Sequence, residues 1–219
     1  MGNEVLPHGD EISQPAPKSR PLRTDAQRSE SALLEAALAV FATSGVDAPV
    51  REIAEKANVG IATLYRRFPQ RSDLIVAVFR QQVDACADAA QLLANEHEPA
   101  EAVAQWIQRY AEFLATKRGL ASALHSGNPA YKMLPAYFYK RLQPALQTLL
   151  DAAASSGEVR TDIQAYDLLR AVGNLCCTPT TEDETGYVRR MVALLVDGLR
   201  YSAGASVEAT FVAAPKLEI

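Results

Sequence analysis

The chain has 219 residues, 48% of them hydrophobic, and a formal net charge of −4. Neither a run of about 18 to 20 apolar residues nor a basic-then-apolar leader is present, which argues against a membrane or secreted protein. We therefore expect a cytoplasmic protein in which a small module is joined to a larger core, with its three cysteines, Cys86, Cys176 and Cys177, reduced.

The charge is unevenly distributed along the chain. Residues 18 to 80 carry ten Lys and Arg against seven Asp and Glu, a net charge of +3, whereas residues 1 to 17 carry −3 and residues 81 to 219 carry −4. Because basic residues bind phosphate, the middle segment is the part that could contact nucleic acid, although the whole chain is acidic.

The first predicted helix follows an irregular N-terminal segment. Residues 1 to about 22 contain four prolines and no periodic apolar face, which indicates a flexible arm. Thr24 and Gln27 match a capping box, which predicts a helix that begins at Thr24. Apolar residues then follow at helical spacing until Gly45 ends the helix.

Two shorter helices are expected next. One begins at Pro49 or Val50, and the other runs from about Gly60 to Phe68, where Pro69 stops it. With the first helix they form a compact unit of three helices.

Longer helices are expected in the rest of the chain, up to a loose tail at residues 205 to 219. Their predicted ranges are about 71 to 94, 100 to 117, 120 to 126, 134 to 156, 162 to 177 and 185 to 203. Runs with the alternation of β-strands are hard to find, so the predicted fold class is all-α.

Residues 50 to 74 have the pattern of a helix-turn-helix. Two short helices at a fixed angle need small or apolar facing residues and a turn that reverses the chain. Ala54 allows a close approach, Asn58 can adopt a left-handed backbone conformation, and Val59 can fill the gap between the helices. The second helix then offers small, hydroxyl and guanidinium groups, which suit the major groove of DNA.

The same segment resembles the TetR family of bacterial transcriptional regulators from about Ala26 to Phe79. The family's Thr-Leu-Tyr triplet, basic residue, aromatic residue and short link are matched by Thr63, Leu64, Tyr65, Arg67, Phe68 and Pro69. Residues 168 to 176 also look like the C-terminal domain of one subgroup. The resemblance implies an N-terminal helix-turn-helix DNA-binding domain at residues 23 to 70 and a larger helical ligand-binding and dimerisation domain at residues 71 to 204.

By this resemblance, individual residues acquire expected roles in binding a double-stranded DNA operator. The positions that usually touch phosphates are Thr63, Tyr65, Arg67 and Arg71, those that tend to reach bases are Arg51, Ile61 and Ala62, and Gly60 and Arg66 complete the set. Gly60 stands where many relatives have Ser or Thr, and Arg67 replaces a frequent His, so the operator sequence does not follow from the family. The basic residues Lys18, Arg20, Arg23 and Arg28 form either a DNA-binding arm or a solubilising tail.

Two apolar stripes in the last helices favour a homodimer, as the resemblance also implies. The candidate interface residues are Leu168, Leu169, Val172, Leu175, Tyr187, Met191, Leu194, Leu195 and Leu199. Either stripe could instead be part of the chain's own core.

Aromatic residues in the middle helices suggest a cleft for a small apolar effector. The candidate pocket residues are Trp106, Tyr110, Phe113, Leu124, His125, Met133, Tyr137, Phe138, Asn174 and Cys177. Core packing alone would explain most of them. With the DNA-binding motif, this pattern predicts a repressor that a small molecule releases from a palindromic operator.

Other classes of function have less support. No catalytic motif accompanies His125 or the cysteines, so we predict no catalytic residue, cofactor or metal site. Two alternatives stay open: a metal- or thiol-responsive regulator that uses His97, His125 or the cysteines, and a helical protein with no DNA role.

Overall fold

The computed structural model describes residues 21–116, 120, 126–177 and 184–201. Within these ranges the chain forms only helices and irregular segments, which confirms the predicted all-α class. The elements are α1 (Pro21–Ser44), α2 (Val50–Lys56), α3 (Ile61–Arg67), α4 (Arg71–Glu96), α5 (Pro99–Thr116), the 3-10 helix η1 (Pro129–Tyr131), α7 (Leu134–Ser155), α8 (Ala165–Cys177) and α9 (Glu184–Arg200). The predicted arm at residues 1–20, most of the predicted helix at residues 120–126 and the predicted tail lie outside the described residues.

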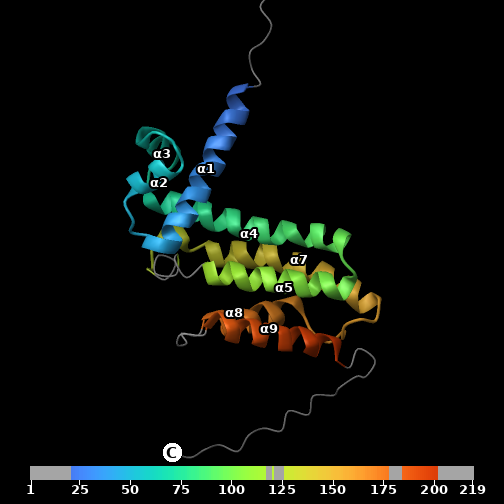
Figure 1. Ribbon diagram of the computed structural model, residues 1–219. Helices are drawn as coiled ribbons and strands as arrows, with labels where there is room; N and C mark the ends of the chain where they lie inside the picture. Colours follow the sequence, from blue (N-terminus) through green and yellow to red (C-terminus); the bar gives the residue numbers. More distant parts are fainter. Residues whose placement is uncertain (1–20, 117–119, 121–125, 178–183, 202–219) are drawn as a thin grey trace, which may run out of the picture.

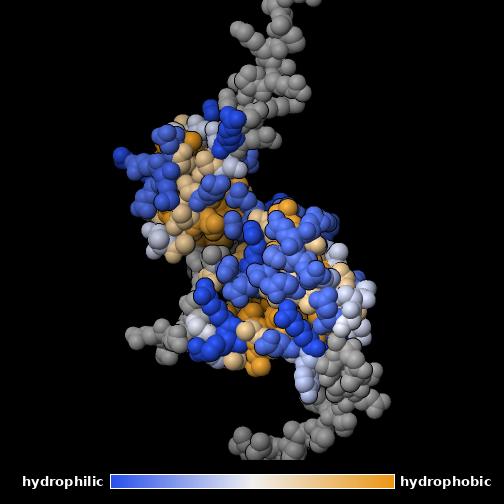
Figure 2. Space-filling model, turned by 45° about the vertical axis from the view of Figure 1, so that its right-hand side comes forward, coloured by the Kyte–Doolittle hydropathy of each residue, from blue (hydrophilic) through white to orange (hydrophobic). Residues whose placement is uncertain are grey.

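The helices form a small unit and a larger one (Figure 1). α1, α2 and α3 make up the small unit, and α4 runs from it into the larger one. There α4 packs on α7 and α5, α5 packs on α8 and α9, and α7 packs on α8. Figure 2 shows the two units joined at a narrower waist. Because α4 belongs to both units, any movement of α4 changes the position of the small unit.

The start of α1 differs from the prediction. The helix begins at Pro21, so Thr24 lies inside it and is not its N-cap. Proline fits the first turn of a helix, where its missing N–H would have had no partner in any case. The end of α1 is as predicted, because Gly45 adopts φ +75°, a left-handed conformation that glycine reaches at little cost.

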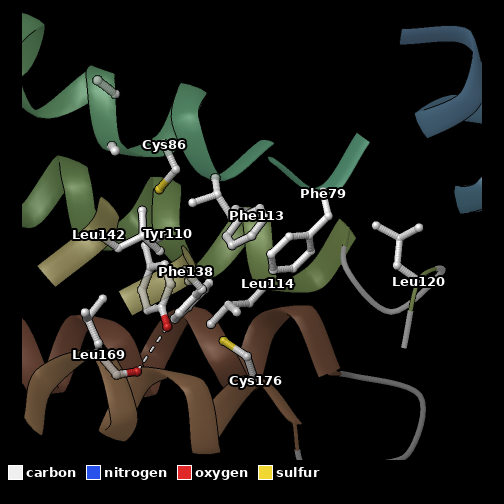
Figure 3. Packing of buried hydrophobic residues seen from close by; sticks show 14 of the residues in the cluster. Phe79, Cys86, Tyr110, Phe113, Leu114, Leu120, Phe138, Leu142, Leu169 and Cys176 are labelled. Carbon is white, nitrogen blue, oxygen red and sulfur yellow. Dashed lines mark hydrogen bonds between the residues drawn. The ribbon is translucent and has the colours of Figure 1, made fainter. Parts of the chain in front are cut away.

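Apolar side chains form one continuous core through both units. Figure 3 shows part of it, where Phe79, Phe113 and Phe138 pack between α4, α5 and α7. The polar atoms of Trp106 and Tyr110 are paired within this core. Trp106 Nε1 donates to the Cys86 carbonyl oxygen at 2.9 Å, and Tyr110 Oη donates to the Leu169 carbonyl oxygen at 3.1 Å. The latter bond links α5 to α8.

A polar cluster joins α4 to α7 at the partly exposed edge of their interface. The Tyr137 hydroxyl donates to the Asp84 carboxylate at 2.7 Å, and Arg141 Nε donates to the same carboxylate at 2.6 Å. Arg141 also reaches Asp88 at 2.8 Å, and the Arg80 guanidinium lies 5.0 Å from the centroid of the Tyr137 ring. Desolvation, followed by the hydrogen bond to Asp84, raises the pKa of Tyr137. We call Arg80, Asp84, Asp88, Tyr137 and Arg141 the α4–α7 clamp.

None of the helices in the described part of the chain is both long and apolar enough to cross a membrane.

Candidate nucleic-acid interface

The turn between α2 and α3 has the geometry that its sequence predicts. Asn58 has φ +53°, in the left-handed region, and the Val59 amide donates to the Ala54 carbonyl oxygen at 3.0 Å. Ala54 is 2% exposed, and Val59 is half-buried against the core. The small residue, the left-handed residue and the apolar filler therefore set the angle between the two helices, as a helix-turn-helix requires.

α3 is held by one face and presents the other to solvent. Leu64 is 1% exposed and Phe68 is 6% exposed, so both are core residues, as predicted. Ile61 is 46% exposed and Tyr65 is 50% exposed, although large apolar or aromatic side chains usually gain by burial. The other outward-facing residues of α3 are Ala62, Arg66 and Arg67, while Thr63 is half-buried.

Gly60 is the N-cap of α3 but does not use the conformational freedom of glycine. Its φ of −67° and ψ of 141° are extended values that any residue adopts, and no side chain caps the helix. A Cβ added to Gly60 would meet only Thr63 Oγ1, at 4.0 Å. The entry to α3 is therefore open.

Three arginines of the predicted interface, Arg51, Arg67 and Arg71, have partners within the chain. Arg51 Nε donates to Glu55 Oε1 at 2.7 Å, one turn along α2, and both side chains are well exposed. Arg67 Nη2 donates to Glu30 Oε2, which links α3 to α1. The Glu55 partner follows the familiar spacing of four residues, whereas sequence reasoning missed Glu30 because 37 residues separate it from Arg67.

Arg71 is placed differently from its expected role as a phosphate anchor. Its guanidinium donates to the carbonyl oxygen of Val46, and the residue is half-buried at the junction of the two units. The first turn of α4 is closed by a capping box in which the Gln70 amide donates to Asp73 Oδ2 at 2.9 Å. In this conformation Arg71 therefore holds the loop after α1 against α4 through its Nη1 atom.

The predicted pocket residues do not share one site. Four of them, Trp106, Tyr110, Phe113 and Phe138, are buried and in ring contact with one another. Tyr137 instead belongs to the α4–α7 clamp, Met133 is 65% exposed and Asn174 is exposed, so these three are not part of the buried ring cluster. Leu124, His125 and the Cys177 side chain lie outside the described residues.

The predicted interface residues divide into core and surface. Leu168, Leu169, Val172 and Leu199 are buried within the protomer. In the protomer these four residues belong to the chain's own core, the alternative that the sequence left open, because an amphipathic helix turns its most apolar face towards its own core. Leu175, Met191 and Leu195 are half-buried, while Tyr187 is 40% exposed and Leu194 is 64% exposed. Tyr201, which the prediction left out, is 78% exposed, and its spacing of seven residues from Leu194 could have identified it.

The described cysteines have the environment of core residues. Cys86 and Cys176 are free thiols and buried. Burial raises the pKa of the Cys86 thiol to about 12, with Arg109 opposing the shift. Among the described residues, no group of three or more His, Cys, Asp or Glu side chains could hold a metal ion.

Two family models match separate parts of the chain. One, described as bacterial regulatory proteins of the tetR family, matches residues 33–78, and the other, described as the C-terminal domain of SbtR-like transcriptional regulators, matches residues 98–201. An HTH-type transcriptional regulator of Staphylococcus aureus is 24% identical over 153 residues, which cover 69% of this chain and 81% of that protein.

Two solved structures of regulators are more similar in sequence. A TetR transcriptional regulator from Streptomyces coelicolor is 37% identical with a TM-score of 0.68, and the match covers 78% of this chain and 97% of that one. A TetR transcription regulatory protein from Mycobacterium vanbaalenii is 33% identical with a TM-score of 0.66, and the match covers 82% of this chain and 99% of that one. Both similarities extend over nearly the whole of the solved chains.

Proposed function

The chain belongs to the TetR family of bacterial transcriptional regulators, and on that premise we propose that it is a repressor released from a palindromic operator by a small molecule. It is a DNA-binding regulator with a helix-turn-helix, and its relatives are transcriptional regulators. The observation that carries the proposal is the exposed face of α3, where Ile61 and Tyr65 stand out from a helix anchored by Leu64 and Phe68.

The proposed contacts with DNA divide between phosphate and base. Thr63, Tyr65 and Arg67 supply hydroxyl and guanidinium donors suited to phosphate oxygens. Base contacts fall to Arg51, which can bond guanine bidentately, and to Ile61 and Ala62, which can pack on thymine methyl groups. Arg71 can take the same role with the guanidinium N–H groups that do not bond Val46, or with all of them if it leaves that carbonyl when DNA binds.

The proposed dimer forms through the exposed parts of α8 and α9. A recognition helix reads one half-site, so a dimer has to place two of them about 34 to 36 Å apart. Tyr187, Leu194 and Tyr201 lie on one exposed stripe, with Met191 half-buried beside them. In the view of Figure 2, hydrophobic residues show at the lower edge of the larger unit, at the height of α8 and α9. Burying this stripe against a second copy would remove it from water.

We propose that the DNA-binding domain ends at residue 70, directly before α4, and that the effector acts through α4. A ligand that prefers one of two positions of α4 shifts the population towards it, and operator affinity changes by the same coupling factor. The aromatic cluster formed by Trp106, Tyr110, Phe113 and Phe138 is the part of the larger unit suited to an apolar ligand.

Selection of genomic DNA fragments that bind the purified protein at low salt would test the proposal and supply the operator. We expect one palindromic sequence to be enriched and the chain to repress a reporter placed behind it. Activation of that reporter would contradict the repressor role, and failure of the folded protein to enrich any sequence would contradict operator binding.

The division of contacts has its own test on the selected operator. Tyr65→Ala should weaken binding to the operator and to unrelated DNA alike, because it removes a phosphate contact. Ala62→Ser should change the preferred base and leave binding to unrelated DNA unchanged. Equal effects of both variants would refute the division.

A further inference from the structure

The ion pair between Arg67 and Glu30 connects the predicted DNA-binding surface to a helix outside the helix-turn-helix. Arg67 lies in the last turn of α3, and its Nη2 atom donates to Glu30 Oε2 on α1. The side chains are 41% and 39% exposed, respectively, so water and solutes reach both partners. The pair is neither buried in the core nor fully surrounded by solvent.

An exposed pair of this kind contributes little to folding, because the charges are screened and two long side chains lose their freedom. Its effect on binding is different. A carboxylate offers arginine the same planar arrangement of anionic oxygens as a phosphate does, so Glu30 and a DNA phosphate compete for one guanidinium. Arg67 can neutralise a DNA phosphate fully only when its ion pair with Glu30 is broken.

We propose that Glu30 is a built-in competitor of DNA phosphate for Arg67 and thereby lowers the affinity of the chain for DNA of any sequence. The proposal rests on the proposed contact of Arg67 with phosphate. When Arg67 turns to DNA, the carboxylate stays beside the α3 surface without its partner and repels the backbone. The acidic residue therefore keeps sequence-independent binding weak, while the base contacts of α3 remain unchanged.

The proposal predicts a change in the salt dependence of binding. Each phosphate neutralised by a free basic residue releases condensed counterions and adds about 0.9 to the slope of log affinity against log salt. A guanidinium that leaves a carboxylate for a phosphate adds less to this slope, because the freed carboxylate attracts cations from the solution. Removing the Glu30 charge should therefore steepen the slope, by at most about 0.9 for each protomer bound.

The experiment compares Glu30→Gln with Glu35→Gln in the full chain. Glu35 is exposed on the same helix, so its variant makes the same change in net charge away from Arg67. Binding to a mixed-sequence duplex of about three helical turns is measured by fluorescence anisotropy at several salt concentrations. We expect Glu30→Gln to bind about two- to fivefold more tightly per protomer, with a steeper slope, and Glu35→Gln to stay near the parent chain.

Arg67→Gln and the double variant Glu30→Gln with Arg67→Gln complete a double-mutant cycle. The gain from Glu30→Gln should be smaller when Arg67 is absent, because the competition for the guanidinium is gone and only the repulsion between the carboxylate and the DNA backbone is left to remove. An equal gain with and without Arg67 would contradict the competition. If Glu30→Gln binds no more tightly than Glu35→Gln, or more weakly than the parent chain, Glu30 is a brace for α3 and the inference is wrong. If Arg67→Gln leaves binding unchanged, the proposed phosphate contact itself fails, and this outcome is distinguishable from failure of the inference alone.

Discussion

At the residue scale, Asn58 and Gly60 in the turn of the helix-turn-helix differ in backbone conformation. Asn58 sits at φ +53°, where most side chains are strained, so asparagine or glycine is needed there. Gly60 sits in extended backbone with open space around its Cα, so nothing in its geometry requires glycine. Replacing Gly60 therefore tests what a cap on α3 contributes.

Gly60→Ser should raise the free energy of unfolding by about 0.5 to 1 kcal/mol, because the hydroxyl can accept a hydrogen bond from the first turn of α3 and serine restricts the unfolded chain. Gly60→Ala is the matched control, since it adds the Cβ without an oxygen. Urea unfolding of the three proteins measures the difference. A serine variant no more stable than the alanine variant would mean that the hydroxyl does not cap the helix.

Cys86 provides a second prediction at this scale. Because burial raises the pKa of its thiol to about 12, the thiol stays protonated at neutral pH, and the thiolate that reacts with electrophiles is scarce. We expect no alkylation of Cys86 in the native protein at pH 8 and complete alkylation in urea, followed by peptide mass spectrometry. Rapid labelling of the folded protein would revive the thiol-responsive alternative.

At the element scale, the α4–α7 clamp holds the helix that joins the two units. Tyr137→Phe removes the hydroxyl that donates to Asp84 and leaves the ring under Arg80. Since the acceptor is charged but partly exposed, we expect a loss of about 0.5 to 1.5 kcal/mol in unfolding free energy. Tyr139→Phe is the control, because Tyr139 lies on the same helix and packs through its ring on Phe138 and Tyr166.

Thermal and urea unfolding of the two variants would distinguish them. Equal losses for Tyr137→Phe and Tyr139→Phe would mean that the clamp contributes no specific hydrogen-bond energy. A looser α4 should also weaken operator binding, since α4 carries the small unit, and the same two variants can be compared in a binding titration.

At the scale of the whole molecule, the proposed dimer predicts a different effect for two leucines of similar exposure. Leu194 on α9 is 64% exposed and Leu92 on α4 is 61% exposed. Leu194→Arg should weaken dimerisation at least about tenfold, because a two-fold interface would bury one new arginine charge from each protomer. Leu92→Arg should leave the oligomeric state unchanged.

Sedimentation equilibrium over a range of protein concentrations measures both variants. Operator affinity should fall with Leu194→Arg and persist with Leu92→Arg, since each half-site alone is bound weakly. A dimer that survives Leu194→Arg would show that copies associate through another surface.

Local sequence was sufficient to predict most of the described helices and the turn between α2 and α3. Gly45, Asn58 and the spacing of Leu64 and Phe68 act within a few residues along the chain, so their effects follow from backbone preferences and helical periodicity. The predicted start of α1 at Thr24 was wrong, because the helix begins at Pro21. A capping box and a proline in the first turn are both common at helix starts, and the sequence pattern does not say which one is used.

Tertiary structure alone decided which partner each side chain received. The links between Arg67 and Glu30, Arg71 and Val46, and Tyr137 and Asp84 join residues far apart in sequence, and no local pattern encodes such contacts. The same holds for burial: Leu168 and Leu194 are equally apolar, yet one lies in the core and the other at the surface, because burial depends on which helices pack together. The sequence by itself thus determined the all-α class of the described residues and the turn of the helix-turn-helix, and the packing of the helices determined which arginines and apolar faces remain available to a partner.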